Sequence, residues 1–133
     1  MNIKKASRRN VKVLSLPGRD AWMLVSKESL GSKTISFGEV HIKPGEYTNP
    51  PHAHLDFEEV IYVERGMAEI WIEGQLEQLR RGEAVLIPTN AKHAIRNIGR
   101  SKLVLLCALP CPDRAKGHVN YEGYEIPQWT KVV

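Results

Sequence analysis

Two short stretches of the sequence contain histidine and glutamate residues, whose side chains can bind a metal ion. In the first, residues 45–66, His52 and His54 are followed by Glu58 and Glu59. On an extended strand, residues i and i+2 project from one face, so both imidazoles can approach the same cation. A carboxylate from a neighbouring strand would offset part of the cation's charge. A histidine pair with this spacing is also typical of two ordinary surface histidines, so the pair alone does not define a metal site.

The alternation of the next segment separates the two glutamates. Glu59 shares one strand face with Ile61 and Val63, whereas Glu58 shares the opposite face with Tyr62. Only one glutamate can therefore point toward a barrel axis, and we expect Glu58 to be solvated. We expect an outer-surface or interface role for Tyr62 rather than a catalytic one.

A third imidazole comes from a distant stretch, residues 82–97. A turn at residues 88–90 precedes His93, which begins a segment whose same-face members are Ile95 and Asn97.

The spacing of turn residues predicts the elements that must position these side chains. Turn signals fall at intervals typical of an all-β sandwich or barrel, and the segments between them alternate with a period of two. Other strands are expected at residues 11–16, 21–25, 34–42 and 102–109, which makes about nine in all. The turn residues are Gly66, Gly74, Gly82, Asn90 and Gly99.

The net charge of the chain is concentrated at its N-terminus. Residues 1–12 hold five of the 19 basic side chains and no acidic one, so the rest of the chain is nearly neutral despite a formal net charge of +4. A basic arm can contact phosphates or anionic lipid, but a solvated terminus explains the same pattern and is the interpretation we favour. We therefore expect no nucleic-acid partner.

Length and apolar patterning predict one domain and no membrane span. A chain of 133 residues can bury one compact core. Its apolar runs are shorter than the roughly 18 residues of a membrane helix, and no signal-peptide core follows the basic terminus. Cys107 and Cys111 are too few for a disulfide scaffold and lack the spacing of redox and zinc motifs, so we expect reduced thiols and a cytoplasmic protein.

The two histidine-containing stretches together resemble the sequence motifs of the cupin superfamily, and the chain resembles its small single-domain members. Gly45, His52, His54, Glu59 and Gly66 follow the spacing of the first cupin motif, with one extra residue before His52. The resemblance covers roughly residues 34–109.

The second motif is matched by residues 82–97. Gly82, Pro88, His93 and Asn97 fall at the cupin positions, and Asn90 replaces the usual glycine. Asparagine tolerates the left-handed backbone that such a turn needs. Asn97 is interpreted either as a donor near the metal or as the residue that closes the turn after the strand.

The resemblance implies a double-stranded β-helix, the cupin or jelly-roll barrel, with a divalent metal near one mouth. It assigns His52, His54, Glu59 and His93 as the ligands, whereas Gly66, Gly82 and Pro88 belong to the structural motif. Mn or Fe is favoured, and Zn, Ni, Co or Cu also suit mixed nitrogen and oxygen donors. Two coordination positions would stay open on an octahedral ion, which favours chemistry over a purely structural role.

The resemblance implies a metal-dependent enzyme that acts on a small-molecule substrate. Oxygenase chemistry is favoured, with decarboxylase, isomerase or lyase chemistry as alternatives. A non-catalytic cupin that binds or senses a sugar or small organic acid is the second hypothesis. The sequence identifies no general acid or base, although Glu46, Tyr47 and Lys92 could reach the mouth. His41 and His118 are expected to be exposed histidines rather than ligands.

Three regions are expected along the chain: a basic arm at 1–12, a cupin domain at 13–112 and a tail at 113–133. Trp71, with Phe57 and Met67, falls outside the inward set, so another element or a second subunit should cover this face. Small cupins commonly form homodimers, and we expect the same here. Tyr124 and Trp129 in the tail predict that it packs on the domain or on a dimer partner.

Overall fold

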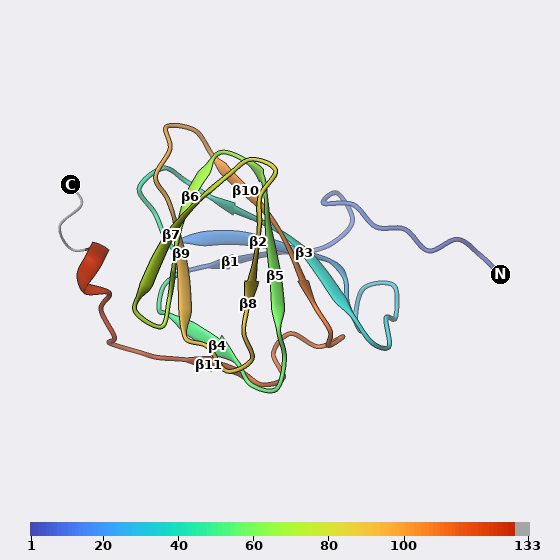
Figure 1. Cartoon of the computed structure of the whole chain (residues 1–133). Coiled ribbons are helices and arrows are strands. Elements are labelled where there is room, and N and C mark those ends of the chain that lie inside the picture. The colour runs from blue at the N-terminus through green and yellow to red at the C-terminus, as the bar shows by residue number, and fades with distance from the viewer. Residues whose placement is uncertain (130–133) are drawn as a thin grey trace.

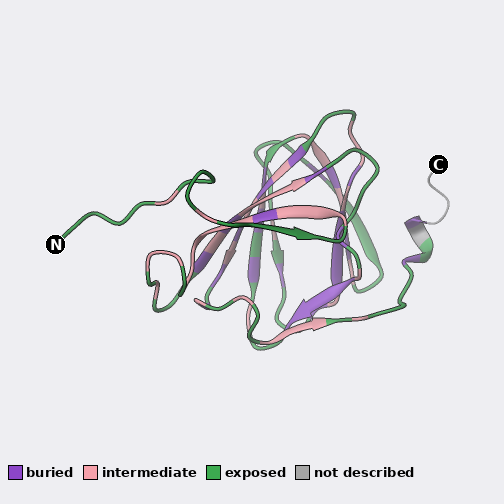
Figure 2. Cartoon of the chain, turned by 180° about the vertical axis from the view of Figure 1, so that it is seen from behind, coloured by how far each residue is buried: buried purple, intermediate pink, exposed green. Residues whose placement is uncertain are grey.

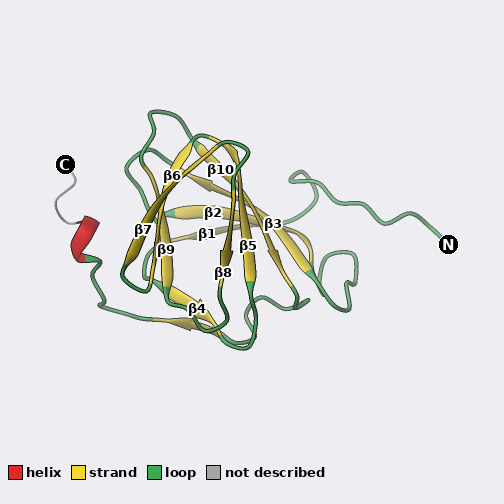
Figure 3. Ribbon diagram, viewed as in Figure 1, coloured by secondary structure: helices red, strands yellow, loops and turns green. Residues whose placement is uncertain are grey.

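The computed structural model describes residues 1–129, whose regular secondary structure is β-strand apart from one short 3₁₀ helix (Figures 1 and 3). The elements are β1 (Val13–Leu16), β2 (Arg19–Val25), β3 (Ser36–Ile42), β4 (His52–His54), β5 (Glu59–Arg65), β6 (Met67–Ile72), β7 (Gln75–Arg80), β8 (Ala84–Ile87), β9 (His93–Asn97), β10 (Leu103–Leu109), β11 (His118–Asn120) and η1 (Pro127–Trp129).

The strands form two antiparallel sheets that face each other (Figure 1). The six-stranded sheet has the order β1-β2-β3-β10-β5-β8, and the five-stranded sheet has the order β11-β4-β9-β6-β7. Neighbouring strands are often distant in sequence, as where β10 pairs with both β3 and β5. The predicted all-β, jelly-roll architecture is confirmed.

The strand limits differ from the expected ones mainly at the first hairpin. β2 begins at Arg19 rather than at residue 21, because pairing with β1 continues to the register Leu16↔Arg19 beside the turn. Gly18, with φ of 80°, allows that tight turn. Eleven strands form within residues 1–129 where about nine were expected, and β11 lies in the tail, for which irregular chain was expected.

The apolar core fills one end of the space between the sheets. Ile42, Val63, Ile70 and Leu103 are almost completely buried there. The inward face of β5 runs from Glu59 to Val63, so one strand connects a polar end of the interior with the apolar end. The inward side chains of the barrel are therefore polar at one end and apolar at the other.

The segment after β11 covers the outer face of the five-stranded sheet. Trp71 and Ala94 form a buried cluster with Ile126 and Trp129. The side chain of Lys92 lies over the rings of Tyr121 and Tyr124, at 4.5 and 4.4 Å from their centroids. The chain's own C-terminal segment thus covers Trp71.

Residues 1–12 extend away from the barrel and are almost entirely exposed, as Figure 2 shows in green. Arg8 provides a contact with the barrel, through an ion pair to Glu39 at 3.0 Å. Within the described residues, no helix has the length and apolar character needed to cross a membrane.

Candidate metal centre

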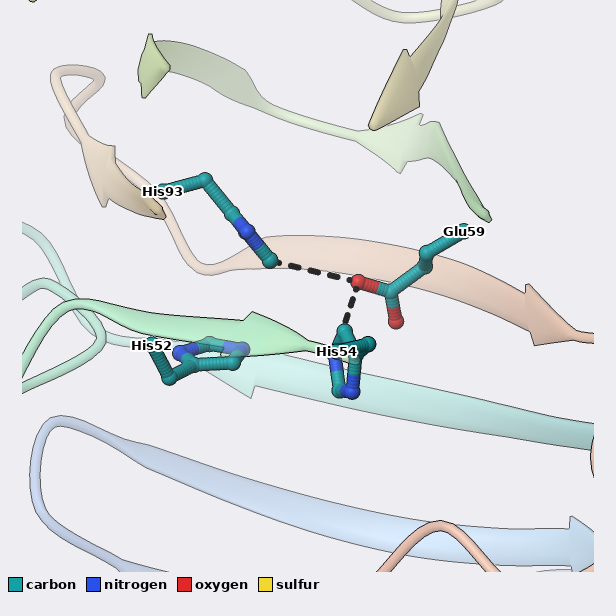
Figure 4. Close-up of side chains that lie close together, drawn as sticks. All are labelled: His52, His54, Glu59 and His93. Carbon is teal, nitrogen blue, oxygen red and sulfur yellow. Dashed lines mark ion pairs between the residues drawn. The ribbon is translucent and has the colours of Figure 1, made fainter. Parts of the chain in front are cut away.

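His52, His54, Glu59 and His93 come together at the polar end of the barrel interior (Figure 4). We call these four residues the histidine–glutamate cluster. Their side-chain nitrogen and oxygen ligand atoms all lie within 4.8 Å of one another, and all four residues are buried. The resemblance to the cupin motifs assigns a metal site to these residues, and the fold brings their three chain segments to one place.

Strand pairing explains why the cluster forms. β4 lies between β11 and β9, and its register places His52 directly opposite His93. Asn90 donates its backbone N–H to the His54 carbonyl at 3.0 Å, which fixes the loop before β9 beside β4. Glu59 enters from the opposing sheet, at the beginning of β5, while Glu58 is exposed. Strand alternation therefore correctly predicts that Glu59, and not Glu58, faces the interior.

The imidazole nitrogens are available to a metal ion. Nδ1 of His93 donates to the Ala91 carbonyl at 2.9 Å, so its Nε2 carries the lone pair. That Nε2 atom, Nδ1 of His52 and both ring nitrogens of His54 are buried without a hydrogen-bond partner among the described residues. Buried polar atoms are normally satisfied, so this group of nitrogens beside a carboxylate fits a divalent ion.

The two oxygens of Glu59 have different surroundings. Oε1 lies 3.3 Å from His54 Nε2 and 3.4 Å from His93 Nε2, as the dashed lines in Figure 4 mark. Oε2 accepts a hydrogen bond from Nη2 of Arg114 at 2.5 Å. Arg114 therefore holds one oxygen while the other faces the imidazoles, an arrangement in which an outer residue orients a metal ligand.

Electrostatics set the protonation states that a metal site needs. Burial alone would raise the pKa of Glu59, but the Arg114 guanidinium and the imidazoles of His54 and His93 hold it well below its usual value. Burial and the neighbouring His93 lower the pKa of His52. At neutral pH the carboxyl group is ionised and the His52 imidazole is neutral, and these are the forms that bind metal.

A cavity of about 400 Å³ opens beside the histidine–glutamate cluster. Its walls are mainly apolar, and Arg19, Arg114, Cys107 and His118 add polar groups. Burial raises the pKa of Cys107 to about 12, so this thiol is protonated at neutral pH. A larger hollow of about 650 Å³ between β6, β7 and β8 contains none of the four cluster residues.

Three of these wall residues, Arg19, Arg114 and His118, were not predicted from the sequence. Arg19 is in phase with Ala21 and Met23 on β2, a signal that becomes visible only if the strand is started at residue 19. Arg114 and His118 lie in the tail, where the sequence carries no alternation that would indicate an inward face.

The expectation that His41 and His118 are exposed is wrong. His118 is half-buried and stacks on His52, with ring centroids 4.8 Å apart and planes 7° from parallel. Its pairing through β11 with β4 brings it into the cavity wall. His41 has a side chain only 10% exposed and an ion pair with Glu39 at 2.6 Å.

The three residues that could have reached the mouth do not line the cavity. Tyr47 packs edge-on against Trp129, with ring centroids 5.0 Å apart, and Lys92 lies over two tail tyrosines. Glu46 is exposed. Their positions at the ends of β-segments direct them to the outer surface that the tail covers, or to solvent.

The remaining motif residues have structural roles. The Asn97 side-chain amide donates to the carbonyls of Ile42 and Ser101, both at 2.8 Å, and its Oδ1 accepts from Gly99 N at 2.8 Å. Asn97 thus closes the turn after β9. Gly66 has φ of 94°, and a Cβ there would approach the Leu103 Cα to 3.1 Å.

The second motif keeps its turn despite the replacement of glycine. Asn90 adopts φ of 68°, and its side-chain oxygen accepts from Asp56 N at 3.1 Å. The Pro88 carbonyl accepts from Ala91 N at 3.1 Å in the same turn. Gly82, with φ of 90°, occupies the turn before β8.

Comparisons with known proteins agree with this architecture. Residues 38–109 match the Cupin domain family, which is more than half of the chain. The polyketide synthase CurC of Streptomyces cyaneus is 29% identical over 82% of this chain and 71% of its own length.

Two solved structures extend the comparison. The polyketide cyclase RemF of Streptomyces resistomycificus has a TM-score of 0.73 and 26% identity, covering 95% of this chain and 90% of its own. The oxalate decarboxylase of Lactobacillus farciminis, solved as a formate complex, has a TM-score of 0.76 and 24% identity over 85% of this chain. The matched region is only 34% of that larger protein, so this likeness concerns the fold.

Proposed function

The chain belongs to the cupin family, and on that premise we propose that it is a metal-dependent enzyme acting on a small organic molecule. The observation that carries this proposal is the buried histidine–glutamate cluster, whose imidazoles include nitrogens without a hydrogen-bond partner in residues 1–129 and which borders a cavity of about 400 Å³. Clefts of this size, mainly apolar with a few convergent polar groups, are typical of small-molecule sites. A purely structural metal site would not need such a cavity.

Ring closure is the reaction class that we favour, in place of the oxygenase chemistry suggested by the sequence. The support is the similarity to a polyketide cyclase over 95% of the chain, together with the similarity to a polyketide synthase protein. In an aldol-type closure, a carbon between two carbonyls loses a proton and bonds to a third carbonyl carbon, whose oxygen takes up a proton. The resulting hydroxyl then leaves as water together with the second hydrogen of the attacking carbon. Neither an oxidant nor a reductant is consumed.

The residues of this chain have separate parts in such a reaction. A divalent ion held by the histidine–glutamate cluster would supply Lewis acidity toward a carbonyl oxygen. The apolar walls exclude water and hold a flexible substrate in a folded conformation. His118 contacts Oδ1 of Asn120 through Nε2 at 2.8 Å. Because an amide oxygen only accepts, Nε2 carries the hydrogen and Nδ1 is the nitrogen that can take a proton.

The test combines metal analysis with a turnover assay. The full chain, purified without added metal, is examined by plasma mass spectrometry and then incubated with a linear poly-β-ketone thioester. We expect stoichiometric metal and a product that has lost water, without oxygen uptake at an electrode. His93→Ala should lose both metal and turnover, whereas His41→Ala, a matched histidine outside the cluster, should keep both.

Two other results would contradict the proposal in different ways. Oxygen uptake with an oxidised product would replace ring closure by oxygenase chemistry on the same metal site. Tight binding of small acids or sugars, with no conversion of any tested substrate, would support the non-catalytic binding protein instead. Mn or Fe is the metal expected in the purified protein, and the same mass spectrum tests this.

A further inference from the structure

We propose that Arg19 and Arg114 form an anion-binding subsite in the cavity wall, which takes an organic oxyanion with an apolar body, such as a carboxylate or an enolate. This inference rests on the proposed function, because it names the substrate class of the same cavity. It depends on three features: an excess of positive charge, the lack of a carboxylate partner for Arg19 among the described residues, and the apolar character of the remaining wall.

The excess charge follows from the ion pairs. Arg114 forms an ion pair with Glu59 through Nη2. Arg19 donates from Nη1 to the Pro17 carbonyl at 3.0 Å, but it makes no ion pair with any carboxylate in the described part of the chain. The cavity wall therefore contains two guanidiniums for one carboxylate. A divalent ion in the cluster would increase the positive charge further.

Burial makes this excess energetically significant. Burial, followed by the repulsion of Arg114, lowers the pKa of Arg19 from its usual high value. Arginine nevertheless stays protonated in proteins, so the positive charge remains. On Arg114, the second terminal nitrogen, Nη1, is buried and has no hydrogen-bond partner within residues 1–129. An anion between the two side chains would relieve the repulsion and accept charge-assisted hydrogen bonds.

The apolar residues of the wall indicate that the part of the ligand away from its anionic group is apolar. Leu14 and Met23 line the cavity from the same hairpin as Arg19, and Val40, Ile61 and Leu105 line it from neighbouring strands. An inorganic anion or a sugar would leave these apolar surfaces without a complementary contact. A planar organic acid satisfies both the arginines and the apolar wall.

A pair of probes of equal size separates charge from shape. Benzoate and benzamide differ in charge but hardly in volume, and their dissociation constants are measured by calorimetry on the full chain. One sample is loaded with Mn(II) and one is treated with a chelator, because a metal ion can also attract a carboxylate. In the chelated sample, where the arginines act without a metal, we expect benzoate to bind about 10- to 100-fold more tightly than benzamide.

Variants assign the preference to residues. Arg19→Met should reduce the ratio of the two dissociation constants to about two, while the benzamide constant and the metal content remain at wild-type values. Arg19→Lys should keep part of the preference. Arg81→Met, an arginine in the exposed turn between β7 and β8, is the control and should behave as wild type.

A second measurement on the unmodified chain covers the case of a variant that fails to fold. Phenylglyoxal modifies accessible arginines, and mass spectrometry locates the adducts. We expect benzoate, but not benzamide, to protect Arg19. Equal modification of Arg19 in both ligands would overturn the proposal.

The remaining outcomes distinguish the subsite from the metal site. If benzoate preference appears only in the Mn(II)-loaded sample, or survives in Arg19→Met, the metal or another group binds the anion and the subsite is rejected. If the chain binds no metal but the preference still depends on Arg19, the subsite stands and the proposed enzyme function falls.

Discussion

Asn97 and His93 lie on the same inward face of β9, yet they differ in how far their polar side-chain atoms are hydrogen-bonded. Asn97, at the apolar end of the barrel interior, has its amide fully occupied by two backbone carbonyls and one backbone N–H. His93, at the polar end, has one nitrogen held by a backbone carbonyl and the other left without a hydrogen-bond partner among the described residues. The fully hydrogen-bonded Asn97 stabilises the fold, whereas the second ring nitrogen of His93 is available to a ligand.

The same contrast applies to whole regions. At the apolar end, Leu103 and Val63 are completely buried and contribute to folding through hydrophobic burial. At the polar end, the histidine–glutamate cluster buries polar groups without an equivalent gain, because several of its imidazole nitrogens have no hydrogen-bond partner among the described residues. We therefore expect mutations at the apolar end to change stability and those at the polar end to change ligand binding.

The largest effect on stability should come from the apolar end. Leu103→Ala removes a side chain with 0% exposure and should lower the free energy of unfolding by about 2–5 kcal/mol. Leu86→Ala, at a position 53% exposed, should change it by no more than about 0.5 kcal/mol. Denaturant titration measures both, and equal losses would show that the apolar end is not the main source of stability.

Metal should stabilise the protein through the polar end alone. At a Mn(II) concentration about 100 times its Kd, the free energy of unfolding should rise by about 2.7 kcal/mol, and a chelator should reverse the increase. His54→Ala should lose this increment because a ligand is missing. Leu103→Ala should keep it, although its starting stability is lower. An undiminished increment in His54→Ala would exclude the histidine–glutamate cluster as the metal site.

Substitution of Asn97 tests whether this motif residue stabilises the fold without contributing to metal binding. Asn97→Ala leaves two carbonyls and one N–H without their partner and should lower the free energy of unfolding by about 1–3 kcal/mol. Metal content per folded chain should be unchanged. A loss of metal at unchanged stability would instead give Asn97 a role toward the ion.

The smallest effect near neutrality is expected from pH. Because burial lowers the pKa of His52 from its ordinary 6.5, the unfolded chain binds more protons than the folded chain below that pH. In chelator, the free energy of unfolding should therefore fall as the pH drops below 6.5. The low pKa of Glu59 adds a further loss below its ordinary 4.5. His52→Gln should flatten the first part of this dependence, and a stability that rises on acidification would contradict the assignment.

Most of the fold and all members of the cluster could be predicted from the sequence. Strand alternation separates Glu59 from Glu58, because burial on one face is a local property of the strand. His93 could be found because its motif carries its own turn residues, among them Asn90 with φ of 68°. In these cases the information lies within a few neighbouring residues.

The groups around the cluster could not be predicted in the same way. β11 is only three residues long, which is too short to show a periodic pattern in the sequence. It is extended because it pairs with β4. His118 enters the cavity wall as a consequence of that pairing. The position of Arg114 is likewise a tertiary effect, set by its ion pair with a carboxylate 55 residues away. Both contacts join segments that are remote in the chain.

The side chains around the cavity come from separate parts of the chain. The cluster is encoded between residues 52 and 93, whereas Arg19 precedes that stretch and Arg114 and His118 follow it. Exchange of the hairpin that carries Arg19 between related barrels would thus alter which molecules are accepted and leave the four cluster residues in place. Exchange of the tail would also remove the Arg114 contact that orients Glu59. Selectivity can then change through Arg19 without a change in metal affinity, whereas a change at Arg114 affects both.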